Sequence, residues 1–132
     1  MPEIVIDTSA VVAVITDASE KPALIRMTED AALVAPSSVH WEVGNAFSAR
    51  LRRGRLTPEL AARSIDIYQS IPIRFVDADL TASLRIVAEH RLYAYDAYLI
   101  ECSRARRAPL LTLDRSLARV AAKMAIDVME IA

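Results

Sequence analysis

Short apolar runs rich in β-branched residues alternate with longer helical patterns along the whole chain, and few folds accommodate that alternation. The apolar runs span residues 4–6, 32–35, 73–76, 110–113 and 126–129. Runs of this kind are typical of strands that are buried on both faces of a parallel sheet. Strands alternating with helices predict an α/β three-layer sandwich with a mainly parallel, five-stranded sheet.

Helical patterns fill the intervals between these runs. Residues 38–53 repeat apolar side chains with helical spacing, and Thr57 followed by Pro58 is typical of an N-cap and a first helical residue. Further helices are predicted over 95–106 and 116–124. The remaining helix is predicted from an apolar stripe formed by Leu80, Leu84, Val87 and Ala88.

Length and composition favour one globular unit. The chain has 132 residues, 54% of them hydrophobic, and no break in composition, so a single domain over 1–132 is expected. The formal net charge of -1 means that a nucleic-acid partner would need a local basic patch. No apolar stretch is long enough to cross a membrane, and a single cysteine, Cys102, fits a reducing cytoplasm.

Acidic residues occur where two of the predicted strands end. Asp7 follows the first apolar run and Asp114 follows the fourth, so both should stand on the rim where parallel strands present their carboxyl ends. Glu42 lies in the first turns of its helix beside small residues, and Asp96 lies at the start of another helix on an otherwise apolar face. An acid that faces inward needs a partner, because an unpaired buried carboxylate is strongly disfavoured.

Carboxylates that meet on one rim repel one another, and a divalent cation relieves that repulsion. Mg²⁺ or Mn²⁺ prefers oxygen ligands and can activate a bound water for attack on a phosphodiester. A simpler interpretation exists for each acid alone. Asp7, Asp96 and Asp114 can each be the N-cap of a helix, and Glu42 can be an ordinary solvated helix residue.

Four blocks of the chain resemble those of PIN-domain ribonucleases, in particular VapC toxins of type II toxin–antitoxin systems. The first block is the run from Val5 to Ala10, and the second is residues 36–53 with Glu42 and Asn45. The third is Tyr95-Asp96-Ala97-Tyr98, and the fourth is residues 110–115. The blocks occur in family order with family-like gaps, whereas segment 101–107 departs from the family pattern with Glu-Cys-Ser-Arg-Ala-Arg-Arg.

The resemblance implies a PIN-type α/β/α sandwich and metal-dependent cleavage of RNA with Mg²⁺ or Mn²⁺ as cofactor. It implies that Asp7, Glu42, Asp96 and Asp114 are the catalytic and metal-binding acids, with Asp7 and Asp96 as the foremost direct ligands. It further implies a homodimer and a small antitoxin protein as partners. The polar residues expected to support the acids are Thr8, Ser9, Asn45 and Thr112.

Two groups of arginines offer sites for RNA phosphates, although cations also suit the ends of helices. The first group, predicted to form a phosphate-binding rim beside the acids, consists of Arg50, Arg52, Arg53 and Arg55. The second consists of Arg104, Arg106 and Arg107. Core packing is the preferred interpretation of Tyr93, Tyr95 and Tyr98, with stacking on bases as the alternative. Trp41 is compatible with the core or with a protein interface.

Three alternative functions follow from the same residues. A PIN nuclease could process RNA without being a toxin. A receiver-like signalling domain also places acids at strand ends, but it carries adjacent acids after the first strand and a lysine near the last. Here Glu3 stands at the wrong end of its run, and residues 126–132 contain no lysine. A non-catalytic module of the same fold is disfavoured because all four acids are present.

Overall fold

A parallel sheet forms the centre of the computed structural model, which describes residues 1–131. Within them, the sheet has five strands in the order β3-β2-β1-β4-β5, and every pairing is parallel. This confirms the predicted sheet. The strands are β1 (Glu3–Ile6), β2 (Ala32–Pro36), β3 (Ile73–Val76), β4 (Leu110–Leu111) and β5 (Val128–Met129).

Burial follows the position of each strand in the sheet. Val5, Leu110 and Leu111 in the middle are fully buried, as expected for strands covered on both faces. β3 differs from the prediction, because Arg74 and Phe75 are exposed. β3 is an edge strand, so it pairs with β2 alone and is covered less completely.

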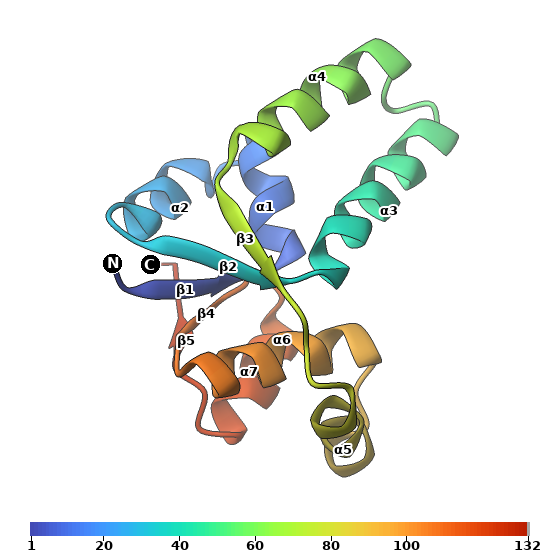
Figure 1. Ribbon diagram of the computed structural model, residues 1–132. Helices are drawn as coiled ribbons and strands as arrows, with labels where there is room; N and C mark the ends of the chain where they lie inside the picture. Colours follow the sequence, from blue (N-terminus) through green and yellow to red (C-terminus); the bar gives the residue numbers. More distant parts are fainter. Residues whose placement is uncertain (132) are drawn as a thin grey trace.

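Helices cover both faces of the sheet and make the predicted three-layer sandwich (Figure 1). Helices α1 to α4 lie on one face and α5 to α7 on the other, as right-handed crossovers require when the chain reverses direction across the sheet. Helix α2 had not been predicted. The helices are α1 (Thr8–Ile15), α2 (Lys21–Thr28), α3 (Ser38–Arg52), α4 (Pro58–Ser70), α5 (Leu80–His90), α6 (Ala94–Arg106) and α7 (Arg115–Lys123).

Helices α3 and α4 form an arm that extends away from the sheet (Figure 1). The predicted start of α4 is confirmed, because Pro58 is its first residue and the Thr57 side chain accepts a hydrogen bond from Leu60 N at 3.2 Å. Near the base of the arm, His40 Nδ1 lies 2.9 Å from the Tyr68 hydroxyl, which joins the two helices through a polar contact.

The stripe predicted for α5 is wrong in its orientation. Leu80 and Leu84 are exposed, whereas Ser83 and Ile86 are buried. Ser83 fits the interior because its hydroxyl donates a hydrogen bond to Asp79 O at 2.7 Å, so its polarity is satisfied within the helix. The helix therefore turns Ser83 and Ile86 inward and leaves two leucines on the surface.

The segment that departs from the family pattern has structural roles here. Glu101 is buried and accepts a hydrogen bond from Asp79 N at 3.2 Å, which ties α6 to the start of α5. Arg106 donates two hydrogen bonds to the Glu3 carboxylate, at 2.9 and 2.7 Å, and so fastens the end of α6 to β1. Cys102, also in this segment, is buried. Arg106 is therefore engaged within the protein and is not a free phosphate-binding group.

The chain direction across the sheet reverses between β1 and β4. Connections from β1 move outward through β2 to β3, and the next strand returns to the other side of β1. Ligands of open α/β sheets bind at the carboxyl ends of strands at such a switch point. Asp7 follows β1 at this point, and its N–H donates to Leu111 O of β4 at 3.0 Å. No helix within residues 1–131 is long and apolar enough to cross a membrane.

Candidate active site

Asp7 is the most firmly held of the predicted acids. It is 6% exposed, and its Oδ1 accepts a hydrogen bond from Thr8 N at 2.7 Å. Its Oδ2 accepts one from the Ser9 hydroxyl at 2.8 Å and one from the Thr112 hydroxyl at 2.7 Å. The carboxylate at the end of β1 is thus fixed by α1 and by the residue that follows β4.

The two hydroxyls can serve Asp7 in one direction only. Ser9 Oγ accepts a hydrogen bond from Leu113 N at 3.0 Å, and Thr112 Oγ1 accepts one from Asp114 N at 3.0 Å. Each hydroxyl has a single proton, and with its acceptor side engaged it turns that proton toward Asp7. The surroundings of Asp7 therefore present three donors to it, namely Thr8 N–H and the hydroxyls of Ser9 and Thr112.

Replacing Thr112 with Val is expected to lower the free energy of unfolding by about 1–3 kcal/mol, because Asp114 N–H loses its acceptor and Asp7 loses a donor. The measurement is urea unfolding, with Thr112→Ser as the matched control that keeps the hydroxyl. A Thr112→Val protein as stable as the Thr112→Ser protein would contradict the role assigned to this hydroxyl.

Glu42 reaches the same rim from α3. Its Oε1 is buried and has no hydrogen-bond partner among residues 1–131. Burial, followed by repulsion from Asp7 and then Asp96, raises the pKa of Glu42 from its usual 4.5 to about 7. The solvated-residue interpretation of Glu42 is therefore wrong, since the carboxyl group lies inside a cluster of negative charge.

Asp96 lies in the first turn of α6, three residues after the N-cap position at Tyr93. Leu99 and Ile100 on its face are buried, which confirms that this face looks inward. The Asp96 side chain makes no hydrogen bond with any residue in the described range 1–131, so it does not cap the helix. Burial, followed by repulsion from Asp114 and Asp7, raises its pKa.

Asp114 is both a helix cap and a neighbour of the acidic cluster. Its Oδ1 accepts hydrogen bonds from Ser116 N at 2.9 Å and from Leu117 N at 3.2 Å, which confirms the capping interpretation for this residue. The residue is exposed, and its charge acts on Asp96. The second carboxylate oxygen is not used by the cap and remains able to bind a ligand.

The structure thus brings the four predicted acids into electrostatic contact. In residues 1–131, however, no three side chains of His, Cys, Asp or Glu stand close enough to enclose a metal ion as a ready-made cage. The donor set still fits a hydrated divalent cation. Mg²⁺ binds through one or two carboxylates and keeps several of its waters, which bridge to donors farther away. Glu42 Oε1 and Thr8 Oγ1 are buried oxygen atoms with no hydrogen-bond partner in the part of the chain that the structure describes, and such a hydrated ion would satisfy them.

The remaining predicted polar residues divide into two groups. Ser9 and Thr112 support Asp7 directly, as described above. Asn45 is exposed, and its side chain makes no hydrogen bond within the described part of the chain. A further residue, Ser38, was not predicted. Its hydroxyl at the start of α3, one turn before Glu42, is buried and has no hydrogen-bond partner among residues 1–131. Its place in the first turn of the helix that carries Glu42 was the available signal.

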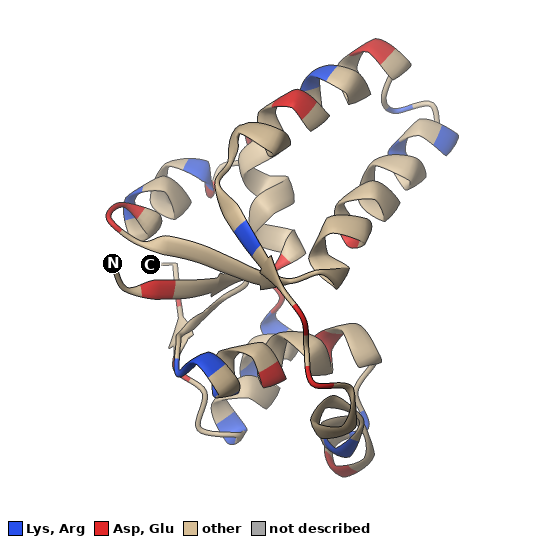
Figure 2. Cartoon of the chain, in the orientation of Figure 1, with Lys and Arg blue, Asp and Glu red and all other residues tan. Residues whose placement is uncertain are grey.

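The arginines of the first basic group lie away from the acidic rim. Figure 2 shows basic residues at the far end of the α3–α4 arm. Arg52 follows Glu42 by ten residues of one helix, a rise of roughly 15 Å. Arg50 lies over the Phe47 ring, with its guanidinium carbon 5.7 Å from the ring centroid. Any contact of this group with RNA would therefore be to nucleotides distant from the acids.

Several aromatic side chains are outside the core. Tyr93 is 84% exposed and Tyr95 49% exposed, so the core interpretation is wrong for both. Trp41, directly before Glu42, is 70% exposed. These three rings neighbour Asp96 and Glu42 in sequence and are accessible to a partner.

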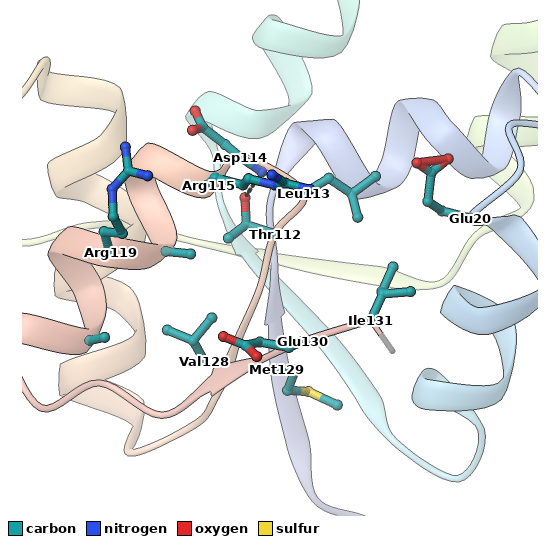
Figure 3. Close-up of a pocket in the computed structure, with 12 residues that line it drawn as sticks. Glu20, Thr112, Leu113, Asp114, Arg115, Arg119, Val128, Met129, Glu130 and Ile131 are labelled. Atoms are coloured by element: carbon teal, nitrogen blue, oxygen red, sulfur yellow. Dashed lines mark hydrogen bonds between the residues drawn. The ribbon is translucent and has the colours of Figure 1, made fainter.

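A pocket of about 610 Å³ adjoins the acidic rim between α7 and the β5 segment (Figure 3). Thr112 and Asp114 line it together with Arg115 and Arg119 of α7. Sequence reasoning missed both arginines. Their spacing of four residues directly after Asp114 places them on one helical face and was the signal that could have found them.

The fold and the rim define an α/β protein whose carboxylates gather at the switch point of a parallel sheet. The PIN domain family model matches residues 4–123, and the chain therefore belongs to the PIN domain family, whose members are nucleases that generally use divalent metals. No curated protein sequence matches significantly.

Two solved structures share the fold. PAE2754 from Pyrobaculum aerophilum aligns with a TM-score of 0.73 and 28% sequence identity, over 96% of this chain and 84% of that chain. VapBC2 from Rickettsia felis, bound to a DNA fragment from their promoter, aligns with a TM-score of 0.67 and 14% identity, over 96% of this chain and 97% of the other. At that identity, the second likeness concerns the fold alone.

Proposed function

We propose that this chain is a metal-dependent endoribonuclease that acts as the toxin of a toxin–antitoxin pair. The observation that carries the nuclease proposal is the cluster of Asp7, Glu42, Asp96 and Asp114 at the switch point, with Glu42 Oε1 buried and unpartnered. A cluster of this kind needs a cation, and PIN nucleases generally use divalent metals.

Asp7 and Asp96 would hold Mg²⁺ or Mn²⁺ most directly, with Glu42 and Asp114 binding it directly or through water. The ion would supply an activated water and stabilise charge developing on the phosphate. Ser9 and Thr112 keep Asp7 in one orientation, because both hydroxyls donate hydrogen bonds to its Oδ2. Glu42 carries a pKa of about 7, which suits a group that exchanges a proton near neutral pH when no cation is bound.

RNA is proposed as the substrate because exposed aromatic side chains flank the acidic rim and exposed arginines lie farther out on the α3–α4 arm. Tyr93 and Tyr95 stand at the start of the helix that carries Asp96 and could stack on unpaired bases. Arg52 and Arg53 at the arm's tip could bind phosphates farther along a strand.

Replacing Arg52 and Arg53 together with Ser is expected to weaken RNA binding and to flatten its dependence on salt. Each lost phosphate contact should reduce the slope of log K against log salt by about 0.7 for a single strand. Fluorescence anisotropy of a labelled single-stranded RNA measures both effects, with Arg26→Ser on α2 as the control. If the salt dependence of binding is unchanged, the arm's tip is not part of the RNA-binding surface.

A toxin role is supported by the fold shared with a VapBC complex and by surface residues suited to a protein partner. Leu80 and Leu84 on α5 are about half exposed, at 58% and 51%, and their spacing of four residues places them side by side as an apolar surface for a protein partner. We infer that a small antitoxin and a second copy of the chain, in a homodimer, are its protein partners, and that it acts in the cytoplasm.

Expression in growing bacterial cells tests the toxin role. Induction of the wild-type chain should arrest growth, and induction of Asp96→Asn at an equal level should not. A wild-type chain that cleaves RNA in solution yet leaves growth unaffected would favour the alternative, a PIN nuclease with a role in RNA processing.

A further inference from the structure

The pocket beside the acidic rim has the size and composition of a nucleotide site. Its volume of about 610 Å³ lies within the range typical of small-molecule sites. Thr112, Leu113 and Asp114 close the end that meets the acidic rim, so a group bound in the pocket would lie next to the acids (Figure 3).

The α7 wall of the pocket is cationic. Arg115 and Arg119 are one helical turn apart, are exposed, and form no ion pair within residues 1–131. Arg119 makes one long contact, with its Nη2 3.4 Å from Ser116 Oγ, and this leaves most of its donors free. Two guanidinium groups on one face present the donor geometry that phosphate oxygens accept.

The opposite wall is mixed. Val128, Met129 and Ile131 are partly buried apolar residues, and together with Leu113 they offer a surface for the flat face of a base. Glu130 lies among them, and Glu20 lines the pocket from the segment before α2. Carboxylates accept hydrogen bonds from the amino groups of bases and from ribose hydroxyls, so they can bind a nucleoside. Their negative charge repels a free anion.

We propose that this pocket binds the nucleotide adjacent to the cleaved bond, with Arg115 and Arg119 on its phosphate and the apolar wall under its base. The inference rests on the proposed RNA substrate and names the residues that position it. The pocket differs from the arm's tip in lying directly beside Asp114, so its effect should fall on the nucleotide next to the scissile phosphate.

The test is the binding of a labelled single-stranded RNA in EDTA, followed by cleavage kinetics with Mn²⁺. The double variant Arg115→Ala/Arg119→Ala should bind about 10-fold more weakly, and its salt slope should fall by about 1.4 for two lost contacts on a single strand. In cleavage, KM should rise by a similar factor while kcat changes little. The matched control is Arg26→Ala, an exposed arginine on α2 outside the pocket.

A second variant tests the pocket independently, in case the double arginine variant does not fold. Ala122 lines the pocket and is exposed on α7, so Ala122→Glu introduces bulk and negative charge without disturbing the core. It should reproduce the weaker binding, whereas Ala62→Glu on the exposed face of α4 should not. Circular dichroism of each variant identifies any that are unfolded.

The outcomes separate this inference from the proposed function. If Arg115→Ala/Arg119→Ala and Ala122→Glu bind RNA as tightly as the wild type and the control variants do, the nucleotide site is refuted, whether or not the protein cleaves RNA. Pocket-dependent binding without any metal-dependent cleavage would support the site and contradict the nuclease proposal. A protein that binds no RNA at all would refute both.

Discussion

Asp7→Asn is expected to lower the rate of RNA cleavage by more than about 100-fold. Loss of a partner outside the direct ligands of a metal commonly costs about 10–100-fold, and Asp7 is proposed as a direct ligand. The substitution has a second effect. The NH₂ group of the new amide must face either Thr8 N–H or the Ser9 and Thr112 hydroxyls. All three groups donate to Asp7 in the wild type, so the NH₂ group meets another donor in either orientation.

The measurement compares initial cleavage rates of purified Asp7→Asn and wild-type protein at saturating Mn²⁺. Thr112→Ser is the control for disturbance of the network, because it keeps the hydroxyl that donates to Asp7. A folded Asp7→Asn protein with cleavage within a few-fold of wild type would remove Asp7 from the catalytic residues.

Glu42→Gln is expected to stabilise the metal-free protein by on the order of 2 kcal/mol near pH 8. Burial and the charges of Asp7 and Asp96 raise the pKa of Glu42 to about 7, so the fold disfavours the ionised form. A group with a raised folded-state pKa of this kind costs nothing well below pH 4.5, where it is protonated in both states. The cost grows as the pH rises and is complete above about pH 7.

Thermal unfolding in EDTA at pH 5 and pH 8 measures this effect. The advantage of Glu42→Gln should be several degrees at pH 8 and much smaller at pH 5. Added Mn²⁺ should raise the melting temperature of the wild type more than that of the variant, because Glu42 contributes to the proposed metal site. Equal melting temperatures of variant and wild type at pH 8 in EDTA would show that Glu42 bears no repulsion.

The number of strands and their parallel direction could be predicted, because each strand is a distinct apolar run separated from the next by helical patterns. Their order in the sheet, β3-β2-β1-β4-β5, was not predicted. The run at 110–113 illustrates the limit, since the observed strand covers only Leu110–Leu111. Thr112 leaves the strand to donate to Asp7, so a local polar contact ends the ladder there. Helix α2 was missed because it is short and begins with Lys21 and Pro22, a pattern that also suits a loop.

The orientation of α5 could not be predicted from its apolar residues alone. Ser83 is buried because its hydroxyl finds a backbone acceptor, and this contact is invisible in a hydrophobic pattern. The acids were predictable from their places after strands and at helix starts. The network of Ser9 and Thr112 was predictable as polar support, but its single direction depends on two backbone N–H groups that only the folded chain brings together.

Clustering in the sequence did not identify the arginines that lie near the acids. Clustering in sequence drew attention to Arg52 and Arg53, yet the straight run of α3 carries them away from the rim. Arg119 lies outside both arginine clusters of the sequence and lines a pocket that shares Asp114 with the acids. Proximity to the site therefore depends on which end of a helix meets the sheet, and that is set by the topology.

Asp96→Asn gives the most direct test of the metal-dependent ribonuclease. This carboxylate makes no hydrogen bond within residues 1–131, so the amide replaces it without breaking a contact and changes little besides the charge. Labelled single-stranded RNA is incubated with wild type or Asp96→Asn in Mg²⁺, in Mn²⁺ and in EDTA. We expect wild-type cleavage with a divalent ion only, and loss of cleavage in a folded Asp96→Asn protein. Cleavage that persists in EDTA, or equally in Asp96→Asn, would contradict a metal-dependent reaction at these acids.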